Sequence, residues 1–413
     1  MQFGMMKLAW RNLWRNRTRT LIAASAIAIG LALLLVGRGM QADQYGKMRD
    51  SALRSAGGSV LVHADGYWLE QTSEHVVPDA AARVALLEGV EGVDTVIPRI
   101  LVNGLLASPR GAAGARLTGF DPEREAVLND WSRFIVEGSF LAGDEVDPLV
   151  LGRGVVELLE IELGDRVVLT ATDSEGEVTR ALFHLTGILE TGSGMLDDSL
   201  AFTSLEAAAE AMRTGDGVTQ IGVVGTESPE VLQQRVLAAL DGADDLEVLT
   251  WSEALPELVG AIEVDRTMAE IYGVVLFIIV GFGIANTFLM IVLERIRELG
   301  LLGAMGLTPA RIGRLIMAEA VLMSAVSITV GVTLGYLGHL WLASTGIDVG
   351  EMVGGDYDIS GIAMDDLVIR SRVVVSEWLV ASGFVFVMVM LSSLYPAIRA
   401  TRLDPATAMR TYE

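Results

Sequence analysis

The residues that most often carry chemistry are scarce in this chain. It has no cysteines, which excludes disulfides, thiolate metal sites and a cysteine nucleophile. The four histidines are His63, His75, His184 and His339. None of them is paired at the spacing of metal ligands, so we expect no metal site. The carboxylates are numerous but dispersed, and an enzyme is therefore the weakest hypothesis for this sequence.

A phosphate-binding loop is also missing from the sequence. Such a loop needs the pattern Gly-x-x-x-x-Gly-Lys-Ser/Thr, whose backbone amides cradle the phosphates of ATP. The only Gly-Lys pair is Gly46-Lys47, and a methionine follows it. The chain therefore has no P-loop of its own, and any use of ATP needs another protein.

One segment, residues 294–312, has a pattern that suits mechanical work. Apolar residues recur at the spacing of a short helix with charged flanks, and glycines that can end this helix follow. Thr308 is then a suitable N-cap, and Pro309 a suitable first residue, for the next helix. The segment either simply connects two larger elements or forms a stiff knob that takes force from a neighbouring subunit. The residues expected to form the knob are Glu294, Arg295, Arg297, Glu298, Leu299, Leu302 and Met305.

The elements that must position this segment are membrane spans. A bilayer core of about 30 Å takes roughly 20 helical residues to cross. Four stretches run without a charged residue for about that length, at 20–37, 271–293, 320–347 and 378–398. The sequence therefore predicts a membrane α-helical protein with four transmembrane helices, at residues 20–40, 267–293, 315–343 and 377–398.

Charge indicates which side of the membrane each segment occupies. Residues 41–268 hold 40 acidic and 15 basic residues, a net charge of −25, so the rest of the chain sums to +2 within the total of −23. Residues 1–19 carry five basic residues and no acidic one, which predicts cytoplasmic termini. The acidic segment is then extracytoplasmic. Its surface is either simply solvated or a docking face for a basic partner, and we expect no binding to nucleic acid.

Residues 1–19 are expected to form a cytoplasmic amphipathic helix, with Lys7, Arg11 and Arg15 along one side and tryptophans along the other. This basic flank and the following apolar run also fit a cleaved signal peptide. However, no small-x-small cleavage site comes before Arg38, unless cleavage falls in the weak 39–42 stretch. We therefore favour an uncleaved first span.

The remaining segments complete the domain prediction. Residues 41–266 alternate short strands and helices, which predicts a large extracytoplasmic α+β domain, with a porter-like α/β portion and a β-rich insert at about 116–203. Residues 41–55 would extend the first helix as a stalk, and Ser252 would cap a helix that enters the second span. The other segments are a cytoplasmic coupling loop at 294–314, an extracytoplasmic loop at 344–376 and a cytoplasmic tail at 399–413.

The third predicted span contains small residues four positions apart, Ser327, Gly331 and Gly335. Residues at this spacing lie on one helix face and allow a second helix to approach closely. They could instead line a substrate path, but helix packing is the simpler interpretation.

Three motifs together resemble the MacB/FtsX-type ABC transporter permeases. Residues 294–306 resemble the coupling helix of those proteins, although Leu301-Leu302-Gly303 lacks one usual basic residue. Residues 8–17 resemble the first cytoplasmic helix, and residues 395–406 resemble the tail after the last span. The order of one span, a large outer domain and three further spans is also typical of this family.

Within that family the outer domain is most similar to LolC and LolE, the permease subunits that release lipoproteins from the inner membrane. Residues 119–125, 134–138, 149–167 and 187–202 carry this resemblance. LolC has a long hook hairpin that captures a carrier chaperone. The turn at 172–179 is too short for such a hook, so in this respect the chain is more like LolE, and a second, hook-bearing permease is expected.

The resemblance implies a non-catalytic permease subunit of the bacterial inner membrane. It would form a homo- or heterodimer on a dimer of ABC ATPases, which would hold ATP and Mg²⁺, while this chain holds no cofactor. Closure of the ATPases would push on the knob and move the outer domain. Other implied partners are membrane lipid, a lipoprotein substrate and a periplasmic carrier. An apolar groove between the first two spans would accept the acyl chains; its candidates are Leu33, Val36, Met40, Met268, Tyr272 and Val275.

Two other functions stay open within the same family. One is MacB-like export of peptides or small molecules with a periplasmic partner. The other is FtsX-like signalling, in which the outer domain activates a cell-wall hydrolase and nothing is transported. FtsX chains usually have a smaller outer domain, which counts against the second.

Overall fold

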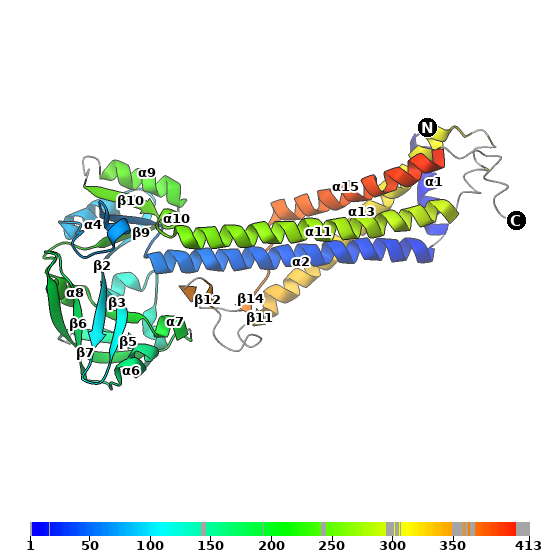
Figure 1. Cartoon of the computed structure of the whole chain (residues 1–413). Helices are drawn as coiled ribbons and strands as arrows, with labels where there is room; N and C mark the ends of the chain where they lie inside the picture. Colours follow the sequence, from blue (N-terminus) through cyan, green and yellow to red (C-terminus); the bar gives the residue numbers. More distant parts are fainter. Residues whose placement is uncertain are drawn as a thin grey trace. The chain divides into compact units, whose positions relative to one another are not determined.

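The computed structural model of the chain describes residues 2–15, 17–141, 146–192, 194–240, 245–294, 301, 305, 307–348, 358–359, 362–363 and 368–401. The chain divides into two compact units (Figure 1). A helical unit comprises Met1–Tyr45, Val264–Ile347 and Val368–Glu413, and an α/β unit comprises Gly46–Glu263 and Asp348–Leu367.

The helical unit is built from long helices. They are α1 (Gln2–Arg15), α2 (Arg17–Ala56), α11 (Pro256–Glu294), α13 (Pro309–Thr345) and α15 (Val375–Thr401). Among the described residues, three helical stretches are long and apolar enough to cross a membrane: Thr20–Ala56, Pro309–Thr345 and Val375–Tyr395. The second predicted span falls within α11, a helix of 39 residues. The count of four spans stays a prediction.

Helix α2 continues without a break from the helical unit into the α/β unit, as expected for the stalk. It stops at a pair of glycines. The amide groups of Gly57 and Gly58 both donate to the carbonyl of Leu53, at 3.0 Å. Their φ angles of +97° and +157° lie in a region that side chains rarely allow. Glycine at these two positions therefore fixes where the helix ends.

The expected start of the helix that enters α11 was wrong. Ser252 is not the N-cap; Thr250 is, and it forms a capping box with Glu253 ahead of the short helix α10 (Trp251–Ala254). The chain then breaks at Leu255 and starts again with Pro256 at the head of α11. The break has a physical cause, because a residue before proline is disfavoured in the helical region while proline suits the first helical position.

The α/β unit is organised around one sheet that, among the described residues, has ten strands. The strands are β1 (Val60–Ala64), β2 (Val93–Ala107), β3 (Ala112–Phe120), β4 (Ile135–Gly138), β5 (Pro148–Gly152), β6 (Arg166–Thr172), β7 (Val178–Leu189), β8 (Leu200–Ser204), β9 (Gln220–Gly225) and β10 (Leu246–Thr250). The accompanying helices are α3 (Tyr67–Glu70), α4 (Ala80–Glu88), α5 (Pro122–Glu125), η1 (Trp131–Phe134), α6 (Arg153–Leu159), α7 (Gly194–Asp197), α8 (Leu205–Met212) and α9 (Pro229–Ala239).

Strand β2 connects the two parts of this sheet. Its first half pairs with β9, within the run β10–β1–β9–β2, and its second half pairs with β3 and β6. The pairings β2–β3–β8–β5–β7–β6–β2 close into a ring. A closed ring removes free sheet edges. The segment predicted as a β-rich insert, about 116–203, supplies most of this ring.

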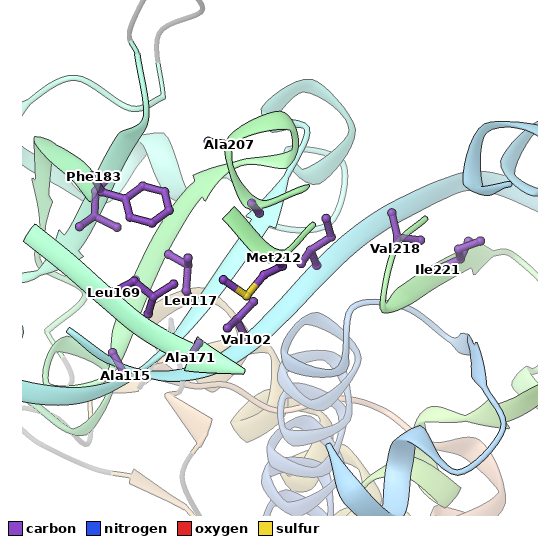
Figure 2. Packing of buried hydrophobic residues seen from close by; sticks show 14 of the residues in the cluster. Val102, Ala115, Leu117, Leu169, Ala171, Phe183, Ala207, Met212, Val218 and Ile221 are labelled. Atoms are coloured by element: carbon purple, nitrogen blue, oxygen red, sulfur yellow. The ribbon is translucent and has the colours of Figure 1, made fainter. Parts of the chain in front are cut away.

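One hydrophobic core runs through both parts of the sheet. Figure 2 shows Val102, Leu117, Leu169 and Met212 packed together, with Val218 and Ile221 in the same cluster. These side chains come from β2, β3, β6, α8 and β9, except Val218, which lies just before β9. The ring and the remaining strands therefore share buried contacts and do not form separate domains.

The turn at 172–179 joins two strands that pair as an antiparallel hairpin. Strands β6 and β7 are joined by five residues, and the buried Asp173 carboxylate accepts hydrogen bonds from the amides of Glu175 and Glu177, both at 3.0 Å. Ser174 donates to the carbonyl of Arg213 at 2.8 Å. The turn is short and tied to its surroundings, so it does not extend into a long hook.

His63 is a buried titratable group in this unit. Its Nδ1–H donates to the carbonyl of Thr219 at 2.9 Å, and its ring stacks on Tyr67 with 4.5 Å between centroids. Burial disfavours the charged imidazolium and lowers the pKa of His63 from 6.5 to about 4. The folded unit therefore holds this histidine neutral.

We expect the α/β unit to lose stability as the pH falls from 6.5 to 4. In that pH range His63 is protonated in the unfolded chain but stays neutral in the folded unit. Protonation therefore favours the unfolded chain and lowers the free energy of unfolding by about 3 kcal/mol. Denaturant unfolding of the purified protein, followed by tryptophan fluorescence, measures this. His63→Asn keeps a donor and cannot titrate, so it should flatten the pH dependence. An unchanged slope in this variant would contradict the assignment.

Candidate functional site

Most of the predicted knob lies outside the described residues, namely Arg295, Arg297, Glu298, Leu299 and Leu302. Glu294 is the last residue of α11. Met305 is exposed, and its amide donates to the carbonyl of Leu301 at 2.9 Å. Thr308 is the N-cap of α13 and Pro309 its first residue, as predicted, although the Thr308 side chain forms no capping hydrogen bond.

Helix α1 is tied to α13 through a buried carboxylate. The Asn12 side-chain amide donates to Glu319 Oε1 at 2.7 Å, and Glu319 is 7% exposed. A carboxylate removed from water needs such a partner, because an unsatisfied buried charge is costly. The Asn12 amide supplies this partner.

Two of the three small residues of α13, Gly331 and Gly335, lie where α2 packs against it. Ser327, Gly331 and Gly335 are all buried. A Cβ atom at Gly331 would stand 2.9 Å from the carbonyl oxygen of Ala28, and one at Gly335 would stand 3.1 Å from the Leu35 side chain. The two backbones therefore approach more closely than larger side chains allow. Their placement favours helix packing over a substrate path.

A second close approach joins α2 to the segment before α15. The amide of Arg372 donates to the carbonyl of Gly39 at 2.9 Å, and a Cβ at Gly39 would collide with Ser371 Oγ. Asp43, 7% exposed at its side chain, accepts from the Arg370 amide at 3.0 Å and pairs with Arg372 Nε at 3.2 Å. We call Gly39, Asp43, Arg370, Ser371 and Arg372 the Asp43 clasp.

The neighbouring face of α2 reaches α11 through polar side chains. Gln41 donates to Tyr45 Oη at 3.0 Å, and Tyr45 donates to Asp265 Oδ2 at 3.2 Å. Arg38 donates weakly to Gln41 Oε1 at 3.5 Å. One stretch of α2 thus contacts both α11 and the segment that leads into α15.

Sequence reasoning missed the Asp43 clasp. Two signals were present: Gly39 and Asp43 are four positions apart on one helix face, and two arginines stand together in an otherwise acidic segment. Neither signal identifies its partner, because the contact joins positions 327 residues apart.

The predicted acyl groove is placed only in part by the structure. Leu33, Met268, Tyr272 and Val275 are exposed on α2 and α11, with Leu33 at 68% and Tyr272 at 72%. Met40 is half-buried. Val36 instead lies beside α13, since a Cβ at Gly338 would stand 3.0 Å from its Cγ2 atom. The groove stays a prediction.

Helices long and apolar enough to cross a membrane, combined with a large α/β unit in the same chain, are typical of a membrane protein. A family model described as the MacB-like periplasmic core domain matches residues 20–243, more than half of the chain. A second, described as the FtsX-like permease C-terminal domain, matches residues 270–405. The chain belongs to the family of FtsX/MacB-like ABC transporter permeases, which confirms the resemblance inferred from its motifs.

Several curated relatives align along nearly the whole chain. The lipoprotein-releasing system transmembrane protein LolC of Neisseria meningitidis serogroup B is 24% identical over 412 residues, covering 95% of this chain and 94% of the relative. LolE of Haemophilus influenzae is 22% identical, covering 98% and 99%. The pyoverdine export ATP-binding/permease protein PvdT of Pseudomonas fluorescens is 25% identical, covering 98% of this chain and 59% of that protein.

We expect Gly39→Leu to destabilise the helical unit, because its side chain would collide with Ser371 and the carbonyl of Arg372. Overpacking of this kind costs about 1–3 kcal/mol. Gly37→Leu is the matched control, since a Cβ at Gly37 meets nothing within 4 Å and both changes gain the same helix propensity. Melting temperatures of the full chain in detergent compare the two variants. Equal melting temperatures would show that the close contact at Gly39 does not stabilise the helical unit.

Proposed function

We propose that this chain is a permease subunit that extracts lipoproteins from the inner membrane, powered by a separate ATPase subunit. The observation that carries the proposal is the alignment with LolC, which covers 95% of this chain and 94% of the relative. It includes the helices and the α/β unit together. The alignment with PvdT, whose name includes ATP binding, covers only 59% of that protein, and this chain has no P-loop sequence. Both facts support an ATPase on another chain.

The proposed topology has four spans, with α11 as the second. Residues 271–293 carry no charge, and α11 is helical throughout. The basic residues of the first 19 positions place both termini in the cytoplasm, and the α/β unit then lies in the periplasm. A dimer of such permeases would stand on a dimer of ATPases.

The proposed mechanism is mechanical. Closure of the ATPases on ATP would push the knob between α11 and α13. The Asn12–Glu319 hydrogen bond ties α1 to α13, and the glycines of α13 bring it into close contact with α2. The displacement would then pass along α2 to the Asp43 clasp. Packed interfaces of this kind switch between discrete arrangements and do not deform continuously.

The knob can be tested by loosening it. We expect Leu299→Gly with Leu302→Gly to leave ATP hydrolysis intact while lowering ATP-dependent lipoprotein release by at least about tenfold, since each glycine costs roughly 1 kcal/mol of helix stability. Leu301→Gly is the control; it makes the same change one residue away, and Leu301 is exposed. If the double variant still couples hydrolysis to release, the knob is not the transmitting element.

The acyl groove can be tested by photocrosslinking. A photoreactive residue at Leu33 or Tyr272 should form adducts with a lipidated substrate. The same residue at Leu379 or Val380 of α15, which are equally exposed at 69% and 71%, should not. Adducts at the α15 positions, with none at Leu33 or Tyr272, would show that the acyl chains do not bind between α2 and α11.

Export is the second candidate function, and the alignment with PvdT supports it. FtsX-like signalling to a cell-wall hydrolase is the third, supported by the match of the C-terminal family model. Purification with native partners discriminates among them. Lipoprotein release predicts a P-loop protein with bound lipoprotein, export predicts a periplasmic adaptor, and signalling predicts a hydrolase.

A further inference from the structure

The α/β unit contains a cleft of about 840 Å³. Its floor is one face of the β2–β3 pair, where Arg99 lies opposite Phe120, Leu101 opposite Thr118 and Asn103 opposite Arg116. Side chains alternate along a strand, so the intervening residues face the core on the other side of the sheet. The walls are the end of α2, the segment from α5 to η1, and the segment from α7 into β8.

The cleft is basic, although the segment that contains it is strongly acidic. Four arginines contribute to its lining: Arg54, Arg99, Arg116 and Arg133. The acidic residues that contribute are Glu125 and Asp130. Residues 41–268 have only 15 basic residues against 40 acidic ones, so about a quarter of the basic residues gather here.

One of these arginines has a structural role. Arg99 Nε and Nη2 donate to the two Glu125 oxygens at 2.9 and 2.6 Å, and both side chains are almost fully buried. Asn129 also donates to Glu125, at 2.8 Å. This pair neutralises itself and forms part of the cleft wall. Counted over all the lining residues, four arginines against two acidic residues give a formal net charge of +2.

The exposed arginines stand beside aromatic side chains. The Arg133 guanidinium lies 4.6 Å from the centre of the Phe134 ring, and Trp131 and Trp68 line the same cleft half-buried. Arg116 is exposed on the floor, where its Nε donates to Asn103 Oδ1 at 3.3 Å. Guanidinium groups bind carboxylates through paired hydrogen bonds, and a concave wall strengthens the field that attracts them.

This combination suits a polypeptide better than a hydrocarbon chain. Arginine, tryptophan and phenylalanine are the residues enriched where proteins bind other proteins. An acyl chain in the cleft would remove guanidinium groups from water and offer them no partner, which is costly. A floor made of two neighbouring strands also accommodates an extended segment.

We propose that this cleft binds an acidic, extended polypeptide segment of the transported substrate. The inference rests on the proposed function and adds to it a recognition site for the protein part of a lipoprotein, separate from any site for its acyl chains. The surrounding negative charge of the unit would repel acidic segments elsewhere, so charge complementarity directs them to the cleft.

The test uses the full complex in neutral detergent at low salt, without nucleotide. The probe is a fluorescein-labelled ten-residue peptide in which aspartate and glutamate alternate with leucine, compared with the same peptide carrying asparagine and glutamine. Fluorescence anisotropy should show binding of the acidic peptide only. Arg116→Gln with Arg133→Gln should weaken it about tenfold or more, as expected for loss of charged hydrogen bonds. The control, Arg110→Gln with Arg180→Gln, removes two exposed arginines outside the cleft lining and should keep the wild-type affinity.

Three results would overturn the proposal: equal binding of the neutral peptide, an equal loss in the control variant, or tighter binding of short-chain phosphatidylglycerol than of the acidic peptide. The measurement uses neither ATP nor lipoprotein, so it separates the two proposals. If the protein binds the peptide but releases no lipoprotein, the cleft still binds acidic peptides, but the bound segment does not come from a lipoprotein substrate. Release that persists in the Arg116/Arg133 variant, with peptide binding lost, would retain the function and overturn the role of the cleft.

Discussion

The helical unit depends on how closely its backbones approach one another. Between membrane helices the hydrophobic effect supplies little attraction, because lipid tails are as apolar as the side chains, and packing must replace it. Here Gly331 and Gly335 bring α13 against α2, and Gly39 brings α2 against the segment before α15. Larger side chains at these positions would force the helices apart. Helix α2 is thus tightly packed at two places along its length, one against α13 and one against the segment before α15.

The end of α2 is held as firmly within the α/β unit. Gln220 of β9 donates to the carbonyl of Ala56 at 2.8 Å, and the amide of Ser59 donates to the carbonyl of Val223 at 2.9 Å. The strand ring beyond it has no free edge among its paired strands and shares one core with the rest of the sheet. The last turn of α2 and the sheet are therefore joined by buried hydrogen bonds within the α/β unit.

The sequence predicted those elements whose signals are local. The stalk at 41–55 is part of the uninterrupted helix α2, and Thr308 and Pro309 open α13 as their residue types predict. The break at Leu255 was not predicted, because Ser252 is a residue type suited to an N-cap, whereas the true boundary is set by Pro256, which disfavours the helical region at the residue before it. Motifs identified the family because they join charge, glycine spacing and span order over the whole chain.

The sequence could not predict the contacts that join distant segments. Asp43 is paired with arginines near the start of α15, and no periodicity within either segment specifies the other. The cleft arginines come from α2, β2, β3 and η1, so only the strand register brings them together. The knob was recognised from its pattern and its family resemblance, and most of its residues lie outside the described part of the chain.

The most direct test of the proposed force transmission is hydrogen–deuterium exchange at the Asp43 clasp in the chain purified with the proposed ATPase subunit. The amides of Arg370 and Arg372 are bonded to Asp43 and Gly39, so their exchange reports whether the clasp opens. The account predicts that trapping the ATPase with ATP and vanadate changes exchange at residues 368–372 and leaves the buried strand β5 unchanged. Unaltered exchange at the clasp, in a complex that hydrolyses ATP, would contradict it.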